Sequence, residues 1–336
     1  YWFINIVMYI AAVLNNTFVR PAAFYLTGFS NLPYANYYYV FLCFIYILTV
    51  LGNGFLLSLI YLGKMLHTPK YMIVFSLALT DLCGSTALIP KVLDTFLFDR
   101  RYIVYEACLS YMFFVWFFAC VQSWTLVTMA YDRFVAICFP LRYHRIVTKP
   151  SVAAVLLFAW GLSLSVIACM VGLIDRLSFC GSVVVQSFYC DHGPLFRLAC
   201  NDKSWNLTLA FLATVVLIGI PLILIAFTYL CISIALRRIA SGAERLKAFK
   251  TCTSHLILVA IFFLPLLGTS IATMVSISNI HTNARIINST LTHTVPSLLN
   301  PIIYSLKTEE VLNCIRRLCR NNWFHNSVSL KKITSL

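Results

Sequence analysis

Long uninterrupted apolar runs dominate the chain and predict its helices. Each run has about 20 residues or more, enough for an α-helix to cross the hydrocarbon core of a bilayer. The runs are continuously apolar and do not alternate, which favours spanning helices over the strands of a membrane barrel. We therefore expect an all-α membrane protein, a seven-transmembrane helix bundle with spans at about residues 38–62, 71–93, 107–131, 151–173, 206–235, 251–278 and 287–306.

The connections between the runs are short, with one exception, and predict a single bundle domain at residues 37–306. Residues 1–36 are expected to form an N-terminal segment, and residues 307–336 a tail. The tail begins with acids, continues to bases and keeps its apolar residues on one face, which indicates a short amphipathic helix on the membrane surface. The exception is the connection at residues 174–205, and connections of that length are usually functional or disordered.

The composition places the chain in lipid. It is 61% hydrophobic and only 11% charged, whereas a soluble domain carries about 25% charged residues. This excludes soluble enzymes, and no nucleophile with its base or metal-ligand spacing suggests an enzyme. The net charge of +14 does not indicate a nucleic-acid partner, because most of the 25 Lys and Arg residues flank the connections on one side of the membrane. The positive-inside rule makes that side cytoplasmic, with the N-terminus extracellular and the C-terminus cytoplasmic.

An acid and a base stand side by side at the end of the third run. They are Asp132 and Arg133, in the string Met129-Ala-Tyr-Asp132-Arg133-Phe-Val-Ala-Ile-Cys138. Isolated charge is costly in the hydrocarbon core, so this pair is expected at a membrane surface.

Asp81 is the acid deep inside a span. It could act as a polar staple that bonds Asn53 and Asn300, or as a sodium- or proton-linked switch. Both interpretations can hold, and we expect a functional role because intramembrane acids are rarely without one. Apart from this sodium ion or proton, the sequence predicts no cofactor.

The last span ends in Asn300-Pro301-Ile-Ile-Tyr304. Proline removes a backbone donor and bends the helix at this point. A helix with such a weak point can adopt two arrangements, as a switch requires. Any proline kink would give the same local pattern.

Four cysteines on the outer side form an even set, as in proteins exposed to an oxidising environment. Four cysteines allow three pairings, and the sequence alone does not choose between them. We expect disulfides here and no metal site that would recruit Asp191 and His192. The four are Cys108, Cys180, Cys190 and Cys200.

Five stretches together resemble the olfactory receptors, a family of rhodopsin-like (class A) G-protein-coupled receptors. They cover the chain from about residue 24 to 312, and the aromatic content and polar loops look most like those of fish olfactory receptors. One departure is Phe262-Phe263-Leu264-Pro265, where many members have Phe-Tyr-Gly and therefore a tyrosine hydroxyl. The stretches are Gly52-Asn53, Leu66-His67-Thr68-Pro69 with Tyr71-Met72, the Asp132-Arg133 string, Lys247-Ala-Phe-Lys-Thr-Cys-Thr-Ser-His255-Leu, and Pro296-Ser-Leu-Leu-Asn300-Pro301-Ile-Ile-Tyr304-Ser-Leu-Lys.

The resemblance implies a role for each motif. The middle loop cysteine would join span three and the outer two would pair together, giving Cys108–Cys190 and Cys180–Cys200. The Asp132-Arg133 pair would be a cytoplasmic latch whose arginine, once released, faces a stimulatory heterotrimeric G protein that raises cyclic AMP. The receptor would bind an odorant in the cell membrane of an olfactory sensory neuron, with lipid around it.

Apolar stripes at helical spacing in the outer halves of spans three, five and six predict the ligand site. Ordinary bundle packing gives the same pattern, but the small residues would leave room between the helices. No buried acid or base is available there, so we expect a small, neutral or weakly polar odorant. The predicted lining is Val115, Trp116, Ala119, Cys120, Ala210, Ala213, Thr214, Leu217, Phe263, Leu267, Ser270 and Met274, with His192 over the opening.

A transporter or channel is the alternative function, but it would call for internal repeats and ionisable groups along its path, and the sequence shows neither. Among the three glycosylation sequons, Asn15 is the best candidate because it lies furthest from the lipid.

Overall fold

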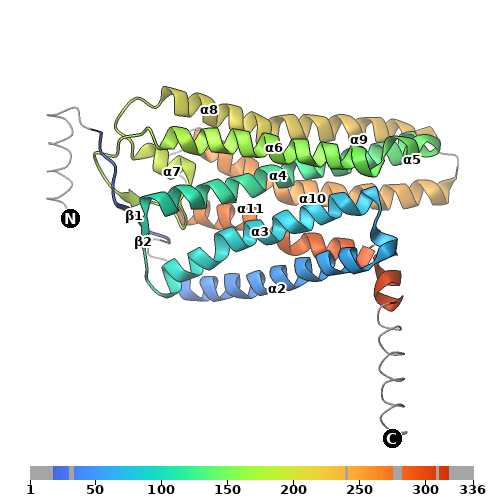
Figure 1. The fold of residues 1–336 in the computed structure, drawn as a ribbon, viewed down its shortest axis with the longest axis horizontal. Coiled ribbons are helices and arrows are strands. Elements are labelled where there is room, and N and C mark those ends of the chain that lie inside the picture. Colours follow the sequence, from blue (N-terminus) through green and yellow to red (C-terminus); the bar gives the residue numbers. More distant parts are fainter. Residues whose placement is uncertain (1–17, 30–33, 239–240, 275–281, 308–309, 318–336) are drawn as a thin grey trace, which may run out of the picture.

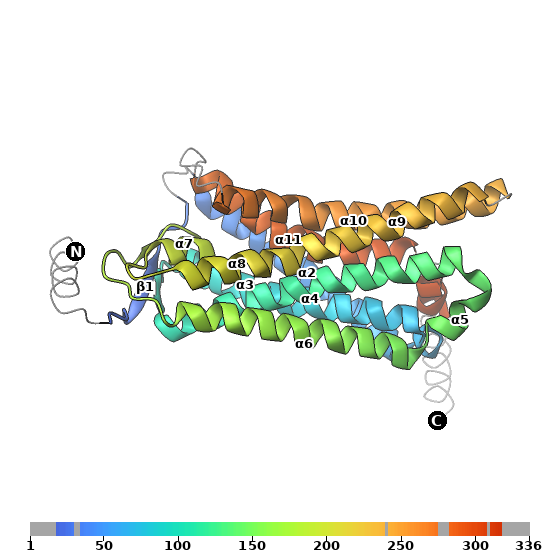
Figure 2. The same cartoon turned by 90° about the horizontal axis from the view of Figure 1, so that it is seen from above.

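Long helices that run side by side form the body of the molecule (Figures 1 and 2). The computed structural model describes residues 18–29, 34–238, 241–274, 282–307 and 310–317. The helices are α2 (Ala35–Leu62), α3 (Pro69–Leu97), α4 (Tyr105–Cys138), α6 (Lys149–Ile174), α8 (Ser204–Thr214) with α9 (Ile220–Arg238), α10 (Gly242–Met274) and α11 (Thr282–Lys307).

Each predicted span lies on one of these helices or on α8 with α9, except that residues 275–278 of the sixth lie outside the described residues. The described helices extend beyond most of the predicted limits. The helices extend furthest beyond the predicted spans at the end that carries the basic residues. There α10 begins at Gly242, whereas the predicted span begins at residue 251. In the same way α4 runs on to Cys138 and carries Asp132 and Arg133 within its last turns. Hydropathy marks the part of a helix inside lipid, but the backbone hydrogen bonds continue into the polar region at no extra cost.

Within the described residues, six helices are long and apolar enough to cross a membrane. Large apolar side chains such as Phe41, Leu157 and Phe227 stand exposed on their outer faces, as expected for surfaces that contact lipid. The seventh, α11, is more polar because it contains many serine, threonine and asparagine residues. Several of these side chains face the bundle. Those that are buried include Ser289, Thr290, Thr292, Thr294, Ser297 and Asn300.

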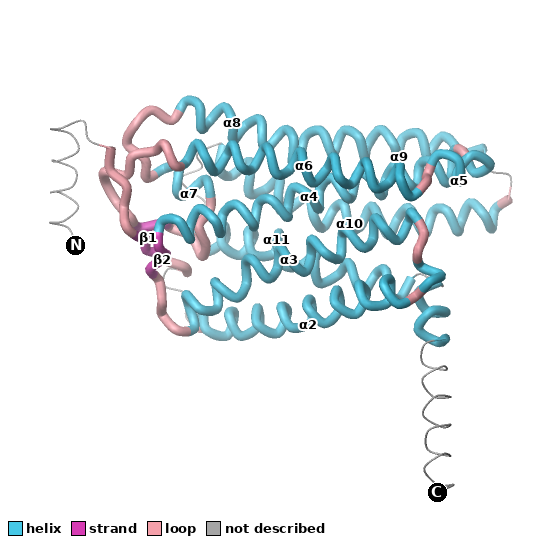
Figure 3. Tube along the Cα trace, viewed as in Figure 1, coloured by secondary structure: helices cyan, strands magenta, loops and turns pink. Residues whose placement is uncertain are grey.

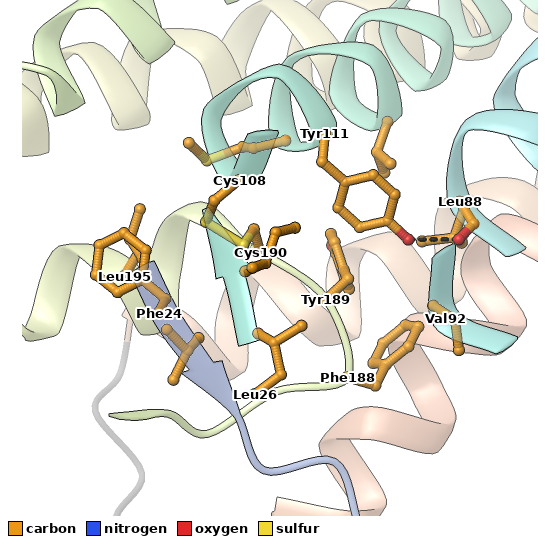
Figure 4. Packing of buried hydrophobic residues seen from close by; sticks show 14 of the residues in the cluster. Phe24, Leu26, Leu88, Val92, Cys108, Tyr111, Phe188, Tyr189, Cys190 and Leu195 are labelled. Atoms are coloured by element: carbon orange, nitrogen blue, oxygen red, sulfur yellow. Dashed lines mark hydrogen bonds between the residues drawn. A yellow bond between two sulfur atoms is a disulfide. The ribbon is translucent and has the colours of Figure 1, made fainter. Parts of the chain in front are cut away.

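A small sheet that the sequence did not predict closes one end of the bundle (Figure 3). Strand β1 (Ala23–Leu26) lies between β2 (Tyr102–Val104), to which it is antiparallel, and β3 (Val184–Val185), to which it is parallel. Alternate residues of β1 point inward, so Phe24 and Leu26 are fully buried (Figure 4). The sheet therefore ties the N-terminal segment to the long connection.

Two disulfides fix that connection. Cys108 at the start of α4 bonds Cys190, and Cys180 bonds Cys200, with Cα–Cα separations of 5.5 Å and 6.0 Å. These are the pairs that the family resemblance implied. The first one holds Tyr189 and its neighbours over the helix ends (Figure 4).

The fifth span is not a continuous α-helix. Between α8 and α9 lies a wider π-helical segment, Val215–Gly219, followed by Pro221. Proline has no N–H, so the carbonyl of Leu217, four residues earlier, loses its helical donor. The hydroxyl of Ser123 on α4 replaces it, at 2.6 Å. The Ser123 hydroxyl thus satisfies a backbone carbonyl that the irregular segment leaves without a donor, as a bilayer without water requires.

At the other end, the tail begins as a helix at residues 310–317 that packs on the bundle. Val311 and Cys314 are buried against α2 and α3. Glu310 accepts hydrogen bonds from Tyr71 and from Lys70 at 3.1 Å. A side chain at Gly63 would collide with the Cys314 sulfur, which explains the glycine.

We expect Ser123→Ala to destabilise the protein, because the Leu217 carbonyl would be left buried without a donor. The cost of such a group is about 1–3 kcal/mol. The matched control is Ser165→Ala, whose exposed hydroxyl bonds only its own helix. Equal melting temperatures for the two purified variants would contradict the role assigned to Ser123.

We also expect Cys108→Ala to prevent accumulation at the cell surface. Loss of a native disulfide commonly costs about 2–5 kcal/mol, and here it would also release the segment that covers the helix ends. Cys169→Ala is the control, since that cysteine is free and exposed on α6. Surface labelling of an epitope-tagged receptor measures both, and normal levels of Cys108→Ala would refute the expectation.

Candidate functional site

A buried carboxylate, that of Asp81, joins three of the spans. It lies on α3, is 0% exposed, and accepts a hydrogen bond from the Gln122 amide on α4 at 2.6 Å. From α11 it accepts bonds from Asn300 at 2.8 Å and Ser297 at 3.3 Å. The sequence analysis named Asn300 but missed Gln122 and Ser297, whose signal was a polar side chain within an apolar run.

The expected bond between Asp81 and Asn53 is absent from the described contacts. The Asn53 amide instead donates to the carbonyls of Thr49 at 3.0 Å and Ser297 at 2.9 Å. Asn53 is fully buried, and buried amide N–H groups need acceptors, which these two carbonyls supply. It therefore supports the cluster by bonding to the backbone beside one of the donors to Asp81.

The Asn300-Pro301-Ile-Ile-Tyr304 segment lies between the Asp81 cluster and the far end of α4. A Cβ atom added at Gly52 would lie 3.1 Å from the ring of Pro301, so α2 and α11 approach closely there. The hydroxyl of Tyr304 donates to the sulfur of Met129 on α4 at 3.4 Å. The segment thus contacts both neighbouring helices at the point where proline weakens α11.

Asp132 and Arg133 lie at the end of the bundle opposite the sheet. Their charged atoms are 3.7 Å apart, and the Arg133 side chain is only 17% exposed. Asp132 also accepts a hydrogen bond from Tyr143 on the short helix α5 (Tyr143–Ile146), at 2.7 Å. Burial raises the pKa of the Tyr143 hydroxyl, and the Asp132 charge adds to this, so it remains a donor. The sequence analysis missed Tyr143, which a short loop brings back to the helix.

Most of the predicted ligand-lining residues meet in two adjoining buried clusters. Val115 belongs to the cluster beside the sheet, while Cys120, Ala213, Leu217 and Phe263 share the central one. Trp116 packs against both, and Leu267 packs against the central cluster. Of the remaining predicted residues, Ala119 is buried, Ala210, Thr214 and Ser270 are half-buried, and the side chain of Met274 lies outside the described residues.

His192 begins the short helix α7 (His192–Arg197) in the long connection, where its ring stacks on Phe196. Burial lowers the pKa of His192 to about 4, so the imidazole is neutral at physiological pH. Asp191, the residue before His192, is also held in place, because the Trp116 indole donates to its carboxylate at 3.1 Å. The connection is therefore attached directly to a predicted ligand residue on α4.

Charged residues lie at the same end of the bundle, but not among the predicted lining residues. A small cavity of about 10 Å³ opens between the long connection and α11. Asp191, Arg197 and Arg285 are among its lining residues. From the sequence, Asp191 was considered only as part of a metal site, and Arg285 precedes the predicted start of the last span.

The predicted glycosylation site, Asn15, lies outside the described residues. A second sequon asparagine, Asn288, is on α11, where its amide donates to Pro265 at 2.9 Å and Thr269 at 2.8 Å. That amide is engaged inside the bundle.

Comparison with known proteins identifies the family. A family model described as "Olfactory receptor" matches residues 42–322. Olfactory receptor 51F2 of Homo sapiens is 36% identical over 308 residues, covering 90% of this chain and 89% of that protein. Olfactory receptor 1 of Rattus norvegicus is 34% identical over 296 residues, covering 88% and 93%.

The fold has a counterpart among solved structures. Squid rhodopsin superposes with a TM-score of 0.70 at 17% identity, over 86% of this chain and 87% of that one. Its likeness supports the seven-helix bundle, and the relatives above are receptors and not enzymes. The apolar helices agree with a multi-pass membrane protein. The chain belongs to the olfactory receptor family.

Proposed function

We propose that this protein is an odorant receptor that binds a small organic ligand in the outer half of the bundle and activates a stimulatory heterotrimeric G protein. The observation that carries this proposal is the largely buried Arg133, whose one ion pair among the described residues is a 3.7 Å contact to Asp132, at the end away from the outer cavity. A weak contact of this kind can be exchanged for a partner at little cost.

The proposed mechanism is a shift between two populations of the receptor. A ligand that binds one arrangement of the outer helices better than the other favours that arrangement by its difference in affinity. The Asp81 cluster bonds α3, α4 and α11 together, so a displacement of one helix at the outer end reaches the others. Release of Arg133 from Asp132 would then open the face that receives the G protein.

For Asp81 itself we propose a proton-linked role in preference to a sodium site. Sodium takes oxygen ligands, whereas Gln122 and Asn300 present amide N–H groups to the carboxylate. Ser297 is the partner that presents an oxygen to the carboxylate, through its hydroxyl. A protonated Asp81 would lose part of its attraction for these donors, which would loosen the three helices.

The proposal extends to orientation and location. The basic residues of the Arg133 end favour the cytoplasm, where anionic lipid and the G protein are found. The sheet and disulfides would then be extracellular, which suits their chemistry. We propose the cell membrane of an olfactory sensory neuron as the site of action.

We expect Arg133→Ala to retain ligand binding but lose cyclic AMP signalling, because the residue that faces the G protein would be gone. Asp132→Asn should do the opposite and raise basal signalling, since it keeps an acceptor for Tyr143 but removes the charge that restrains Arg133. A cyclic AMP reporter, used with a panel of water-soluble odorants and corrected for surface level, measures both.

The control is Asp202→Asn, an exposed acid at the other end of the molecule, which should leave basal and stimulated signalling unchanged. Full signalling by Arg133→Ala at a normal surface level would disprove the role of the latch. Signalling by the wild type through a different second messenger would disprove the type of G protein.

A further inference from the structure

Charged groups of opposite sign face one cavity at the outer end of the bundle. Its walls come from the connection after β3, from α7 and from the start of α11. Asp191 supplies a carboxylate, and Arg285 and Arg197 supply guanidinium groups. The rest of the wall is mixed, with apolar groups such as Phe188 and Ile286.

Asp191 has a fixed position in this wall. The Trp116 indole N–H holds one of its oxygens at 3.1 Å, and the adjacent Cys190 is in a disulfide with Cys108. Burial raises the pKa of the Asp191 carboxyl, and the Trp116 hydrogen bond and the Arg285 charge act against that shift. Asp191 is therefore a buried acid with one hydrogen-bond donor and one guanidinium charge close to it.

Arg285 retains unused hydrogen-bonding capacity. Its guanidinium donates to the carbonyl of Gln186 and is half-buried, yet a guanidinium carries five N–H donors. In the described part of the chain it makes no direct ion pair with Asp191, although the two charges interact. Arg197, on the exposed side, makes no ion pair among the described residues either.

We propose that this cavity is the recognition site for a small zwitterion of the α-amino-acid type, an inference that rests on the proposed odorant-receptor function. The ammonium group binds Asp191, and the carboxylate binds Arg285 and Arg197. A simple acid has a negative charge, which the nearby Asp191 would repel. A simple amine has a positive charge, which Arg285 and Arg197 would repel. A molecule with both charges compensates all three residues.

The wall also accounts for the apolar part of such a ligand. Phe188 and Ile286 line the same space, so a side chain of moderate size packs against them. The cavity of about 10 Å³ holds about one water. Binding therefore requires α7, which lies between the anchored Cys190 and Cys200, to move outward while Asp191 stays in place, and the ligand favours this more open arrangement by population shift.

The test is a direct binding measurement on purified receptor in nanodiscs, with the standard amino acids at millimolar concentration as probes. The best binder is then compared with its deaminated acid, its decarboxylated amine and a neutral alcohol of the same carbon chain. We expect the zwitterion to bind about 10–100-fold more tightly than each analogue, as charge-assisted hydrogen bonds contribute.

Two variants that remove a charge separate direct contact from a structural effect. Asp191→Asn keeps an acceptor for Trp116 and should bind the zwitterion no better than the wild type binds the deaminated acid. Arg285→Gln keeps a polar side chain without the charge and should lose only the preference for the carboxylate. Arg176→Gln, which removes an exposed outer arginine that does not line the cavity, is the matched control and should bind like the wild type.

Each outcome decides the inference. Failure of every amino acid to bind, equal affinity for the neutral alcohol, or unchanged selectivity in both variants would overturn it. A preference for the simple acid that depends on Arg285 alone would replace the zwitterion by an anion and also overturn it. Failure of the proposed function looks different, because the amino acid would bind with the expected selectivity but raise no cyclic AMP.

Discussion

A bundle inside lipid has to satisfy its polar groups from within, and this constraint shapes the rest of the molecule. Asp81 is the strictest case, because it is a buried acid whose known partners are neutral donors on two other helices. Desolvating a carboxylate is costly, and an arrangement that removed these donors would leave that cost uncompensated. The positions of α3, α4 and α11 are therefore coupled through one side chain.

The same constraint explains the irregular parts of the helices. Pro221 leaves a carbonyl without its donor, and Ser123 supplies another from a neighbouring helix. Asn53 and Asn288 likewise turn their amides onto backbone carbonyls of adjacent helices. These bonds cross between spans, so the irregular points of the helices are also the places where the bundle is joined.

The sequence predicted features that depend on composition or on adjacent residues, and missed those that depend on distant contacts. Seven spans follow from uninterrupted apolar runs, and the Asp132-Arg133 pair is visible because its members adjoin. Tyr143 reaches Asp132 only through a loop, and Gln122 reaches Asp81 only through packing of two helices. The three strands are too short to leave a periodic pattern, and their partners lie far apart in the chain. The charged residues that line the cavity were missed because Asp191 and Arg285 are far apart in the chain and meet only in the fold.

The contact between Gly52 and Pro301 has a mechanical consequence. Interlocked side chains resist sliding, because each must leave its groove before the helices can shift. Here a rigid ring meets a residue without a side chain, so the surfaces are smooth at their point of closest approach. The two helices therefore lie close together at Gly52 and Pro301 without side chains that interlock there and resist a shift of α11.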